Sequence, residues 1–253
     1  ANAIGLKGKI IFFLKPIDSG YIAGEESTIL NIIEGKNIEP RLRPPFPTCS
    51  GLYGMPTLIN NIETIYNVYL VSKNKYQNKR FYSVNFDKKN KGVYFLPENL
   101  TIKQILKETD NYPDYDFFVQ IGGDASGEVL NSKQLNKKVD GAGSITVYNL
   151  EKHIPEKLIK YWLSFFRDNS CGQCTPCREG TYRLYEMFEN FGLKMVKEKN
   201  FTDLCDNLFL SSFCALGTAV PIAILSYFKN VYEPLIVSRK KLKVLKKNVK
   251  RKK

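Results

Sequence analysis

Three cysteines recur at intervals of three residues in the segment SCGQCTPCREG, residues 170–180. Cys171, Cys174 and Cys177 can converge on one site if the chain turns into a helix within this segment. Thiolates at such short spacing are typical of a metal or cluster site, and a site of this kind limits how the surrounding chain can fold. The first questions are therefore what forms the helix and where a fourth ligand comes from.

The segment that follows, TPCREGTYRLYEMFENFG, predicts the required helix. Thr175 is a good N-cap, Pro176 suits the first helical position, and Gly192 can end the helix. Cys177 would then lie in the first turn. Backbone N–H groups and the positive end of the helix dipole favour a thiolate or an anionic cluster there.

A four-coordinate site needs one more ligand, for which the chain offers His153, Cys49, Cys205 and Cys214. Cys214 is the best candidate because SSFCALGTAVPIAILSYF predicts a second helix that begins just after it, near residues 218–221. Cys205 is less suitable, since FTDLCDNLF predicts an amphipathic helix with this cysteine on its packed face. We expect His153 to be a turn residue.

The spacing favours iron and sulfide over zinc. Structural zinc usually takes two separated Cys-x-x-Cys pairs, whereas three cysteines in one run with a remote fourth are typical of an iron–sulfur cluster. We therefore predict a [4Fe–4S] cluster. A zinc site, or thiols that bind nothing, remain the alternatives at this point.

The cysteine usage also indicates the compartment. Six cysteines without a secretory signal argue against a disulfide framework and for thiolate chemistry in a reducing environment. The early apolar run IIFFL, residues 10–14, is far too short to span a bilayer.

The net charge of the 253-residue chain, +13, is concentrated in one segment. Residues 239–253, RKKLKVLKKNVKRKK, contain ten Lys or Arg and no acid. Removing them leaves 28 basic against 25 acidic residues, a net charge of +3. The body is therefore nearly neutral, and we expect no nucleic-acid partner. We expect a disordered tail, with binding to an anionic partner or lipid surface as the alternative.

A second informative stretch lies near the beginning of the chain. Gly20 and Gly24 flank YIA, which we interpret as a short strand, and Glu25 and Glu26 follow at the start of a predicted helix, residues 27–34. A glycine at a strand-to-helix turn lets a ligand approach the backbone. The alternative is an ordinary acidic first turn.

A pair of neutral amides follows in PTLINNIETIYNVYLV, where we predict that Pro56 opens a helix. Asn60 and Asn61 lie near its beginning. Amides can bind a ribityl chain or a phosphate through hydrogen bonds, although asparagines on a helix surface are the commoner case.

Five segments in order resemble one family: YIAGEES, RLRPPFP, INNIET, SCGQCTPCREG and CALG. The chain is similar, from about residue 18 to residue 232, to the NADH-oxidising flavoprotein subunit of respiratory complex I. Related diaphorase subunits occur in NAD-dependent hydrogenases and formate dehydrogenases. The resemblance implies a subunit in which hydride passes from NADH to FMN and single electrons pass on to a [4Fe–4S] cluster and to partner subunits.

The resemblance also implies roles for individual residues. The cluster ligands would be Cys171, Cys174, Cys177 and Cys214. The residues that contact FMN or NADH would be Gly20, Gly24, Glu25, Glu26, Asn60, Asn61 and Thr64.

The sequence departs from the family at three points. Ala23 replaces a cysteine, and Asp18 and Ser19 stand where the family has Gly and Ala. The N-terminal half of the family, with its glycine-rich FMN-phosphate loop and its aromatic and lysine contacts to NADH, has no counterpart here. We expect a truncated sequence or a separate partner chain that supplies this half.

The expected fold class is α/β plus α+β. Residues 1–78 would be the C-terminal part of an FMN- and NADH-binding domain, and residues 79–150 a ubiquitin-like β-grasp module of the soluble-ligand-binding type. Residues 151–232 would be a four-helix bundle that carries the cluster, and residues 233–253 the tail. Strands are predicted at 80–86, 92–97, 114–123 and 141–149, and helices at 101–111, 154–169, 175–191, 201–209 and 219–231.

The expected function is that of an NADH dehydrogenase (quinone) flavoprotein subunit. Its partners would be a small [2Fe–2S] subunit and a larger multi-cluster iron–sulfur subunit, and it would lie on the cytoplasmic side of the inner membrane, or on the matrix side in a mitochondrion. The alternatives are a diaphorase subunit of a hydrogenase or formate dehydrogenase, a non-catalytic iron–sulfur conduit without its own NADH site, and a zinc-stabilised interaction domain.

Overall fold

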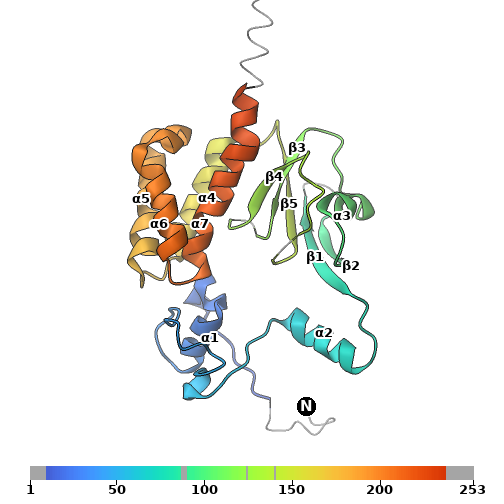
Figure 1. Ribbon diagram of the computed structural model, residues 1–253, viewed down its shortest axis with the longest axis vertical. Coiled ribbons are helices and arrows are strands. Elements are labelled where there is room, and N and C mark those ends of the chain that lie inside the picture. The colour runs from blue at the N-terminus through green and yellow to red at the C-terminus, as the bar shows by residue number, and fades with distance from the viewer. Residues whose placement is uncertain (1–9, 87–89, 124, 140, 238–253) are drawn as a thin grey trace, which may run out of the picture.

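The computed structural model describes residues 10–86, 90–123, 125–139 and 141–237 of the chain. A group of helices stands beside a single mixed sheet, and an arm formed by the first part of the described chain extends below both (Figure 1). One hydrophobic core lies among these helices and extends to the sheet, and a second lies between the sheet and the helix at residues 102–108. No helix in these residues is both long and apolar enough to cross a membrane. The predicted disordered tail, residues 239–253, lies outside the described residues.

The arm begins with short helical turns in place of the predicted strand. Residues YIA belong to a 3-10 helix, η3 (Tyr21–Gly24), which follows another, η2 (Ile17–Ser19). The strand prediction was wrong because no neighbouring strand among the described residues offers this segment hydrogen bonds. The next helix, α1 (Glu26–Ile33), agrees with the predicted one to within a residue at each end.

A second helix of the arm begins later than predicted. After the 3-10 turn η4 (Leu52–Gly54), the next helix is α2 (Ile62–Ser72). It starts where the side chain of Asn61 accepts a hydrogen bond from the backbone N–H of Thr64, 2.8 Å away. Pro56 therefore lies outside the helix that it was predicted to open.

The sheet has five strands in the order β2-β1-β5-β3-β4. The central pair, β1 and β5, is parallel, and the other neighbours are antiparallel. Four strands match predicted ones, while β4 was not predicted. The strands are β1 (Lys79–Asn85), β2 (Gly92–Pro97), β3 (Phe117–Ile121), β4 (Glu128–Asn131) and β5 (Ser144–Asn149).

One helix, α3 (Ile102–Glu108), packs its buried face against the sheet. Thr101 caps it: its Oγ1 accepts from the N–H of Gln104, while the Gln104 side chain accepts from the N–H of Thr101. This reciprocal capping box satisfies two backbone donors that would otherwise lack partners. Three residues of this helix, Ile102, Ile105 and Leu106, are fully buried.

The remaining helices form the second layer of the molecule (Figure 1). Helix α4 contacts α5 and α7, and α6 also contacts α5 and α7. A π-helix, η6 (Phe228–Tyr232), continues α7, and helical structure extends to Val237, beyond the predicted boundary at residue 232. The other elements are α4 (Pro155–Asn169), α5 (Thr175–Phe191), η5 (Gly192–Lys197), α6 (Lys199–Ser211) and α7 (Ala215–Tyr227).

Helix α7 and its continuation η6 join the helical layer to the sheet by covering the outer edge of β4. The backbone N–H of Val129 donates to the Ser226 hydroxyl at 2.9 Å, and the Val129 carbonyl accepts from the Asn230 side chain at 2.7 Å. These bonds satisfy an edge that would otherwise be free to pair with another chain. The contact fixes α7, and with it Cys214 just before the helix, relative to the sheet.

Candidate metal and cofactor site

The three clustered cysteines lie where α4 ends and α5 begins. Gly172 adopts a φ of +77°, which allows the chain to turn sharply between the two helices. Cys174 is the N-cap residue of α5, one position earlier than the predicted cap Thr175, and Cys177 lies in its first turn. Cys174 and Cys177 are only 6% and 4% exposed, while Cys171 is half-buried.

The fourth cysteine lies at the start of another helix. Cys214 is the N-cap residue of α7, which begins at Ala215, before the predicted start near residues 218–221. Pro221 lies inside this helix and not at its start. Burial raises the pKa of the Cys214 thiol, and the backbone N–H groups of Leu216 and Gly217 at this helix start partly oppose the rise. Two helix N-termini, each with a cysteine as N-cap, therefore contribute to one region.

Close packing brings α7 to the cysteines of α5. A Cβ added to Gly217 would lie 3.1 Å from the Cβ of Cys177 and 2.3 Å from the Oγ of Ser212. Only glycine permits this approach. It places the start of α7 against the first turn of α5.

The thiols interact electrostatically as well as through packing. The pKa of Cys177 is raised to about 11, chiefly by burial and further by the neighbouring Cys174, Cys214 and Cys171, whereas a hydrogen bond from Ser170 lowers it. Burial also raises the pKa of Cys214, to which Cys171 and Glu25 add. The raised pKa values of Cys177 and Cys214 favour their neutral thiols, but a coordinating metal removes the proton outright.

The donor set fits an iron–sulfur cluster. Among the described residues, no three His, Cys, Asp or Glu side chains lie together in an arrangement that could hold a single metal ion. A single zinc ion needs sulfur ligands at about 2.3 Å, whereas the four thiolates of a [4Fe–4S] cluster bind four different iron atoms. In addition, two buried side-chain oxygens have no hydrogen-bond partner within the described part of the chain. They are the Oγ of Ser212 and the Oε1 of Gln173, and each residue is close in sequence to a cysteine of the set. A bound group can supply such partners.

Arg178 holds the turn that carries the first two cysteines. Its Nη1 donates to the carbonyl of Gly172 at 2.8 Å, and its Nε lies 3.1 Å from a carboxylate oxygen of Glu179. The guanidinium thus closes the loop from outside and brings a positive charge to it.

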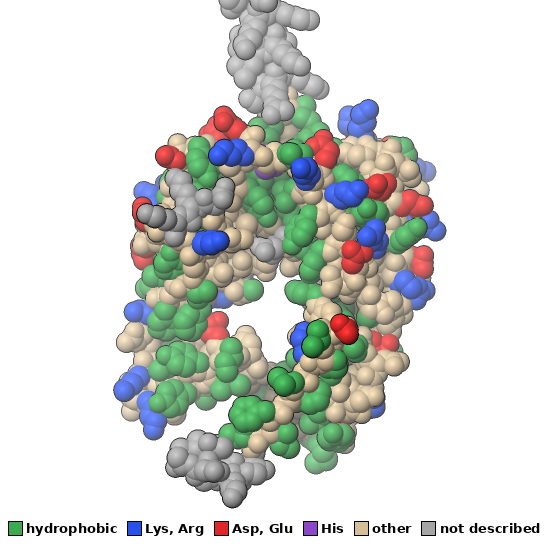
Figure 2. Space-filling view, turned by 180° about the vertical axis from the view of Figure 1, so that it is seen from behind, with side chains coloured by type: hydrophobic (Ala, Val, Ile, Leu, Met, Phe, Trp, Pro, Cys, Tyr) green, Lys and Arg blue, Asp and Glu red, His purple; other side chains and the backbone are tan. Residues whose placement is uncertain are grey.

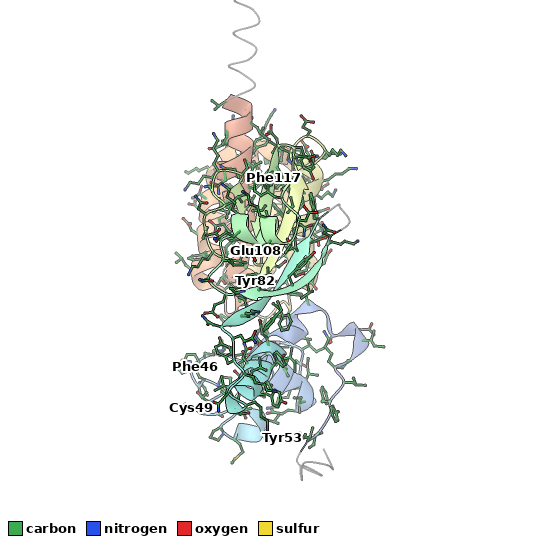
Figure 3. All side chains as sticks on the ribbon, turned by 90° about the vertical axis from the view of Figure 1, so that its right-hand side faces the viewer. Phe46, Cys49, Tyr53, Tyr82, Glu108 and Phe117 are labelled. Atoms are coloured by element: carbon green, nitrogen blue, oxygen red, sulfur yellow. The ribbon has the colours of Figure 1, made fainter. Side chains whose placement is uncertain are left out.

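The remaining sulfur and imidazole groups lie elsewhere. Cys205 is buried on the packed face of α6, as its spacing predicted, and burial raises its pKa to about 12. Cys49 is exposed on the arm, in the part that carries Phe46 and Tyr53 (Figure 3). His153 contacts the Leu150 carbonyl and the hydroxyl of Tyr227, each at 2.8 Å.

The two adjacent carboxylates of the arm are held by one arginine. The Nη2 of Arg43 lies 2.6 Å from Glu25 and 2.7 Å from Glu26. Glu25 is also the N-cap of α1, since its other oxygen accepts from the N–H of Thr28 at 2.8 Å. Glu25 thus caps the helix and Glu26 lies in its first turn, as in the alternative of an ordinary acidic first turn, and Glu26 is the more exposed of the two. Arg43 lies in the segment RLRPPFP, but nothing in the sequence indicated its pairing with Glu25, 18 residues away.

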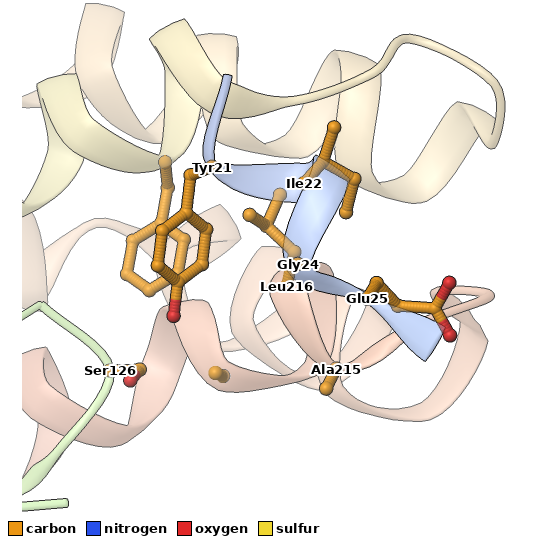
Figure 4. A pocket seen from close by; sticks show the side chains of 9 residues that line it. Tyr21, Ile22, Gly24, Glu25, Ser126, Ala215 and Leu216 are labelled. Carbon is orange, nitrogen blue, oxygen red and sulfur yellow. The ribbon is translucent and has the colours of Figure 1, made fainter. Parts of the chain in front are cut away.

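A cavity of about 320 Å³ lies between the arm and the start of α7. Tyr21, Gly24 and Glu25 line it from the arm, while Ala215 and Leu216 line it from α7 (Figure 4). Its wall is mostly apolar, and Tyr21, Glu25 and Ser126 are the lining residues with polar side chains. The residue after Cys214 therefore borders the same space as the Gly-Glu-Glu turn.

The other predicted cofactor residues lie apart from this cavity. Asn60, Asn61 and Thr64 lie at the exposed start of α2, and none of them lines it. The side chain of Asn61 is occupied in capping α2. Gly20 precedes η3 with a φ of +67°, a conformation that favours glycine.

Comparisons with known proteins agree with the predicted resemblance. Residues 157–235 match the family described as the NADH-ubiquinone oxidoreductase-F iron-sulfur binding region. The chain is 32% identical over 247 residues to the NADH-quinone oxidoreductase F subunit of Streptomyces coelicolor, across 87% of this chain and 55% of that protein. The NADP-reducing hydrogenase subunit HndC of Solidesulfovibrio fructosivorans is 28% identical over 280 residues, with 95% and 56% covered.

A comparison with solved structures points to the same group of proteins. A chain in the crystal structure of an NAD+-reducing [NiFe]-hydrogenase in the H2-reduced state superimposes with a TM-score of 0.75 at 25% identity, covering 83% of this chain and 40% of that one. The predicted resemblance is therefore confirmed. The chain spans about half the length of the curated relatives it matches.

Proposed function

We propose that this chain, whose residues 157–235 belong to the NADH-ubiquinone oxidoreductase-F iron-sulfur binding family, is the electron-accepting part of an NADH-oxidising flavoprotein subunit. Cys171, Cys174, Cys177 and Cys214 would hold a [4Fe–4S] cluster. Such a cluster, when bound, takes up and releases one electron at a time.

The main support for the proposal is that Cys214, which is remote in the sequence, lies near the cysteine run. The electrostatic coupling of Cys177 to Cys214, and the close approach of Gly217 to Cys177, support a common site on the two helix N-termini. The chain itself contributes soft sulfur donors at two helix N-termini and an apolar wall that limits water.

We also propose that the chain has three parts. The sheet order, with its central parallel pair and α3 packed on one face, supports a β-grasp module in residues 79–150. The mutual contacts of α4, α5, α6 and α7 support a four-helix bundle from residue 151 onward. Residues 1–78 would belong to the FMN- and NADH-binding domain.

The exposed face of α2 supports this last assignment. None of its residues is buried. Even its apolar residues Ile62, Val68 and Val71 are 80%, 63% and 57% exposed. Figure 2 shows hydrophobic side chains at the surface of this lower part of the molecule. An apolar helix without a cover is typical of a domain that needs a further segment, which a longer polypeptide or a partner chain would supply.

The flavin site would form where this segment meets the arm. FMN, when bound, exchanges a hydride with NADH and passes electrons on singly. Gly20 and Gly24 would let the backbone approach the cofactor, Glu25 and Glu26 would set the charge beside it, and Asn60, Asn61 and Thr64 would supply hydrogen bonds once α2 is covered. Glu25 lines the cavity that also reaches Ala215, which supports a short path toward Cys214.

The partners would be those of a complex I-like or hydrogenase-like assembly, including a small [2Fe–2S] subunit and a larger multi-cluster subunit. The location would be the cytoplasmic face of the inner membrane, or the matrix face in a mitochondrion. A diaphorase subunit of a hydrogenase is the second candidate, which the likeness to the NAD+-reducing hydrogenase and to HndC favours. Isolation of the assembly and identification of its other subunits distinguish the two.

Metal analysis tests the proposal. We expect anaerobically purified protein to contain iron and acid-labile sulfide in equal amounts, about four of each per chain, and a brown colour. Zinc without sulfide would support the interaction-domain alternative. In the complete assembly, NADH should reduce flavin and cluster in the wild type but flavin alone in Cys174→Ser. An assembly with the cluster but without NADH-reducible flavin would indicate a non-catalytic conduit.

A further inference from the structure

The hydroxyl of Ser170 lies against one of the proposed cluster ligands. Its Oγ is 3.3 Å from the Sγ of Cys177, within the range of a hydrogen bond to sulfur. Ser170 is the residue that ends α4, directly before the cysteine run. Its position is therefore fixed by the same turn that presents Cys171.

The direction of this hydrogen bond follows from the neighbouring contacts. The backbone N–H of Gly172 donates to the Ser170 Oγ at 3.4 Å, so that this oxygen already acts as an acceptor. A metal-bound thiolate has no proton to give. The proton between the two atoms must then come from Ser170, and Cys177 accepts it.

A second hydroxyl lies beside the same cysteine without a partner among the described residues. The Oγ of Ser212 is buried and makes no hydrogen bond there, and it packs against Gly217, which in turn packs against Cys177. A buried hydroxyl without a partner costs about 1–3 kcal/mol. A sulfur atom of a bound cluster would supply the missing acceptor.

We propose that Ser170 and Ser212 are positioning residues whose hydroxyls donate hydrogen bonds to sulfur at the cluster site and so raise its reduction potential. The inference rests on the proposed cluster but goes beyond it, since it concerns residues that bind no iron. Reduction adds negative charge to the sulfurs. A donor therefore stabilises the reduced state more than the oxidised state and makes the potential less negative.

A redox titration of the complete, iron-loaded protein, followed by EPR of the reduced cluster, tests this inference. We expect Ser170→Ala to shift the midpoint potential to a more negative value with iron and sulfide content unchanged. Ser170→Thr keeps the hydroxyl and should titrate near the wild type. Ser212→Ala should shift the potential in the same direction, and the double alanine variant should shift it further than either single change. Ser132→Ala, in the sheet module, is a control that should leave the potential unchanged.

The result that would overturn the inference is an unchanged potential in the double variant at full iron content. If Ser170→Ala loses iron, Ser170→Gly removes the same hydroxyl without adding a methyl group. Loss of iron from both would show a structural role and would also overturn it. Absence of iron and sulfide from the wild type would instead refute the proposed function itself, and this inference with it.

Discussion

The guanidinium of Arg43 lies 2.6 Å from the carboxylate of Glu25, across 18 residues of sequence. The same Nη2 atom reaches Glu26 at 2.7 Å. One cation therefore balances two adjacent carboxylates beside the proposed nucleotide site. Because Glu25 is already held by its capping bonds to α1, Arg43 is the main restraint on the more exposed Glu26.

Removal of this charge should weaken binding of anionic NADH. In the complete flavoprotein we expect Arg43→Gln to raise the KM for NADH about two- to fivefold, which corresponds to about 0.5–1 kcal/mol for a partly exposed pair. Arg43→Lys keeps the charge and should have a smaller effect. Arg183→Gln removes an exposed arginine from α5 and is the matched control. Equal KM values for Arg43→Gln and the control would refute this role.

The close contact at Gly217 should favour cluster binding. In Gly217→Ala the new methyl group would meet Ser212 at 2.3–2.5 Å and Cys177 at 3.1 Å, so α7 must move away from α5. We expect a loss of about 1–3 kcal/mol in stability and a lower iron content. Gly24→Ala is the control for iron retention, since a Cβ there meets nothing within 4 Å. Full iron content in both variants would contradict the expected displacement.

The ion pairs of Glu34 should make the arm sensitive to acid. Lys36, Arg41 and the N–H of Tyr53 lower the pKa of Glu34 from 4.5 to about 2. Because the folded-state pKa is the lower one, these contacts stabilise the fold above pH 4.5, and this contribution is lost as the pH falls toward 2. We expect Glu34→Gln to lower the thermal midpoint at neutral pH.

The difference between wild type and Glu34→Gln should shrink below pH 4.5 and disappear near pH 2. Thermal unfolding followed by circular dichroism across this range measures it. Glu186→Gln, which breaks only an exposed pair on α5, should have little effect at any pH. A difference that is independent of pH would show that the charge of Glu34 is not the cause.

Local signals in the sequence predicted much of this fold. The capping box at Thr101 needs only residues within one turn, so the sequence alone located α3. The helix after the cysteine run was also predicted, with an error of one residue at its N-cap. The start of α2 was misplaced because Pro56 and Asn61 both suit a helix beginning, and the side chain of Asn61 provides the actual cap.

Contacts between distant segments could not be predicted in this way. Strand β4 (Glu128–Asn131) is short and depends on α7 and η6 for hydrogen bonds at its free edge. The pairing of Arg43 with the acidic residues, and the burial of Ser212 beside Gly217, depend on tertiary packing. Cys214 was chosen for its place before a helix, while its nearness to Cys177 depends on how α7 packs against α5.

The most direct test of the account compares Cys214→Ser with Cys205→Ser in anaerobically purified protein. Both change one buried or half-buried cysteine in the helical layer, but only Cys214 belongs to the proposed ligand set. Iron and sulfide analysis and low-temperature EPR after reduction should show an intact [4Fe–4S] cluster in Cys205→Ser and its loss in Cys214→Ser. A full, unaltered cluster in Cys214→Ser would contradict the account.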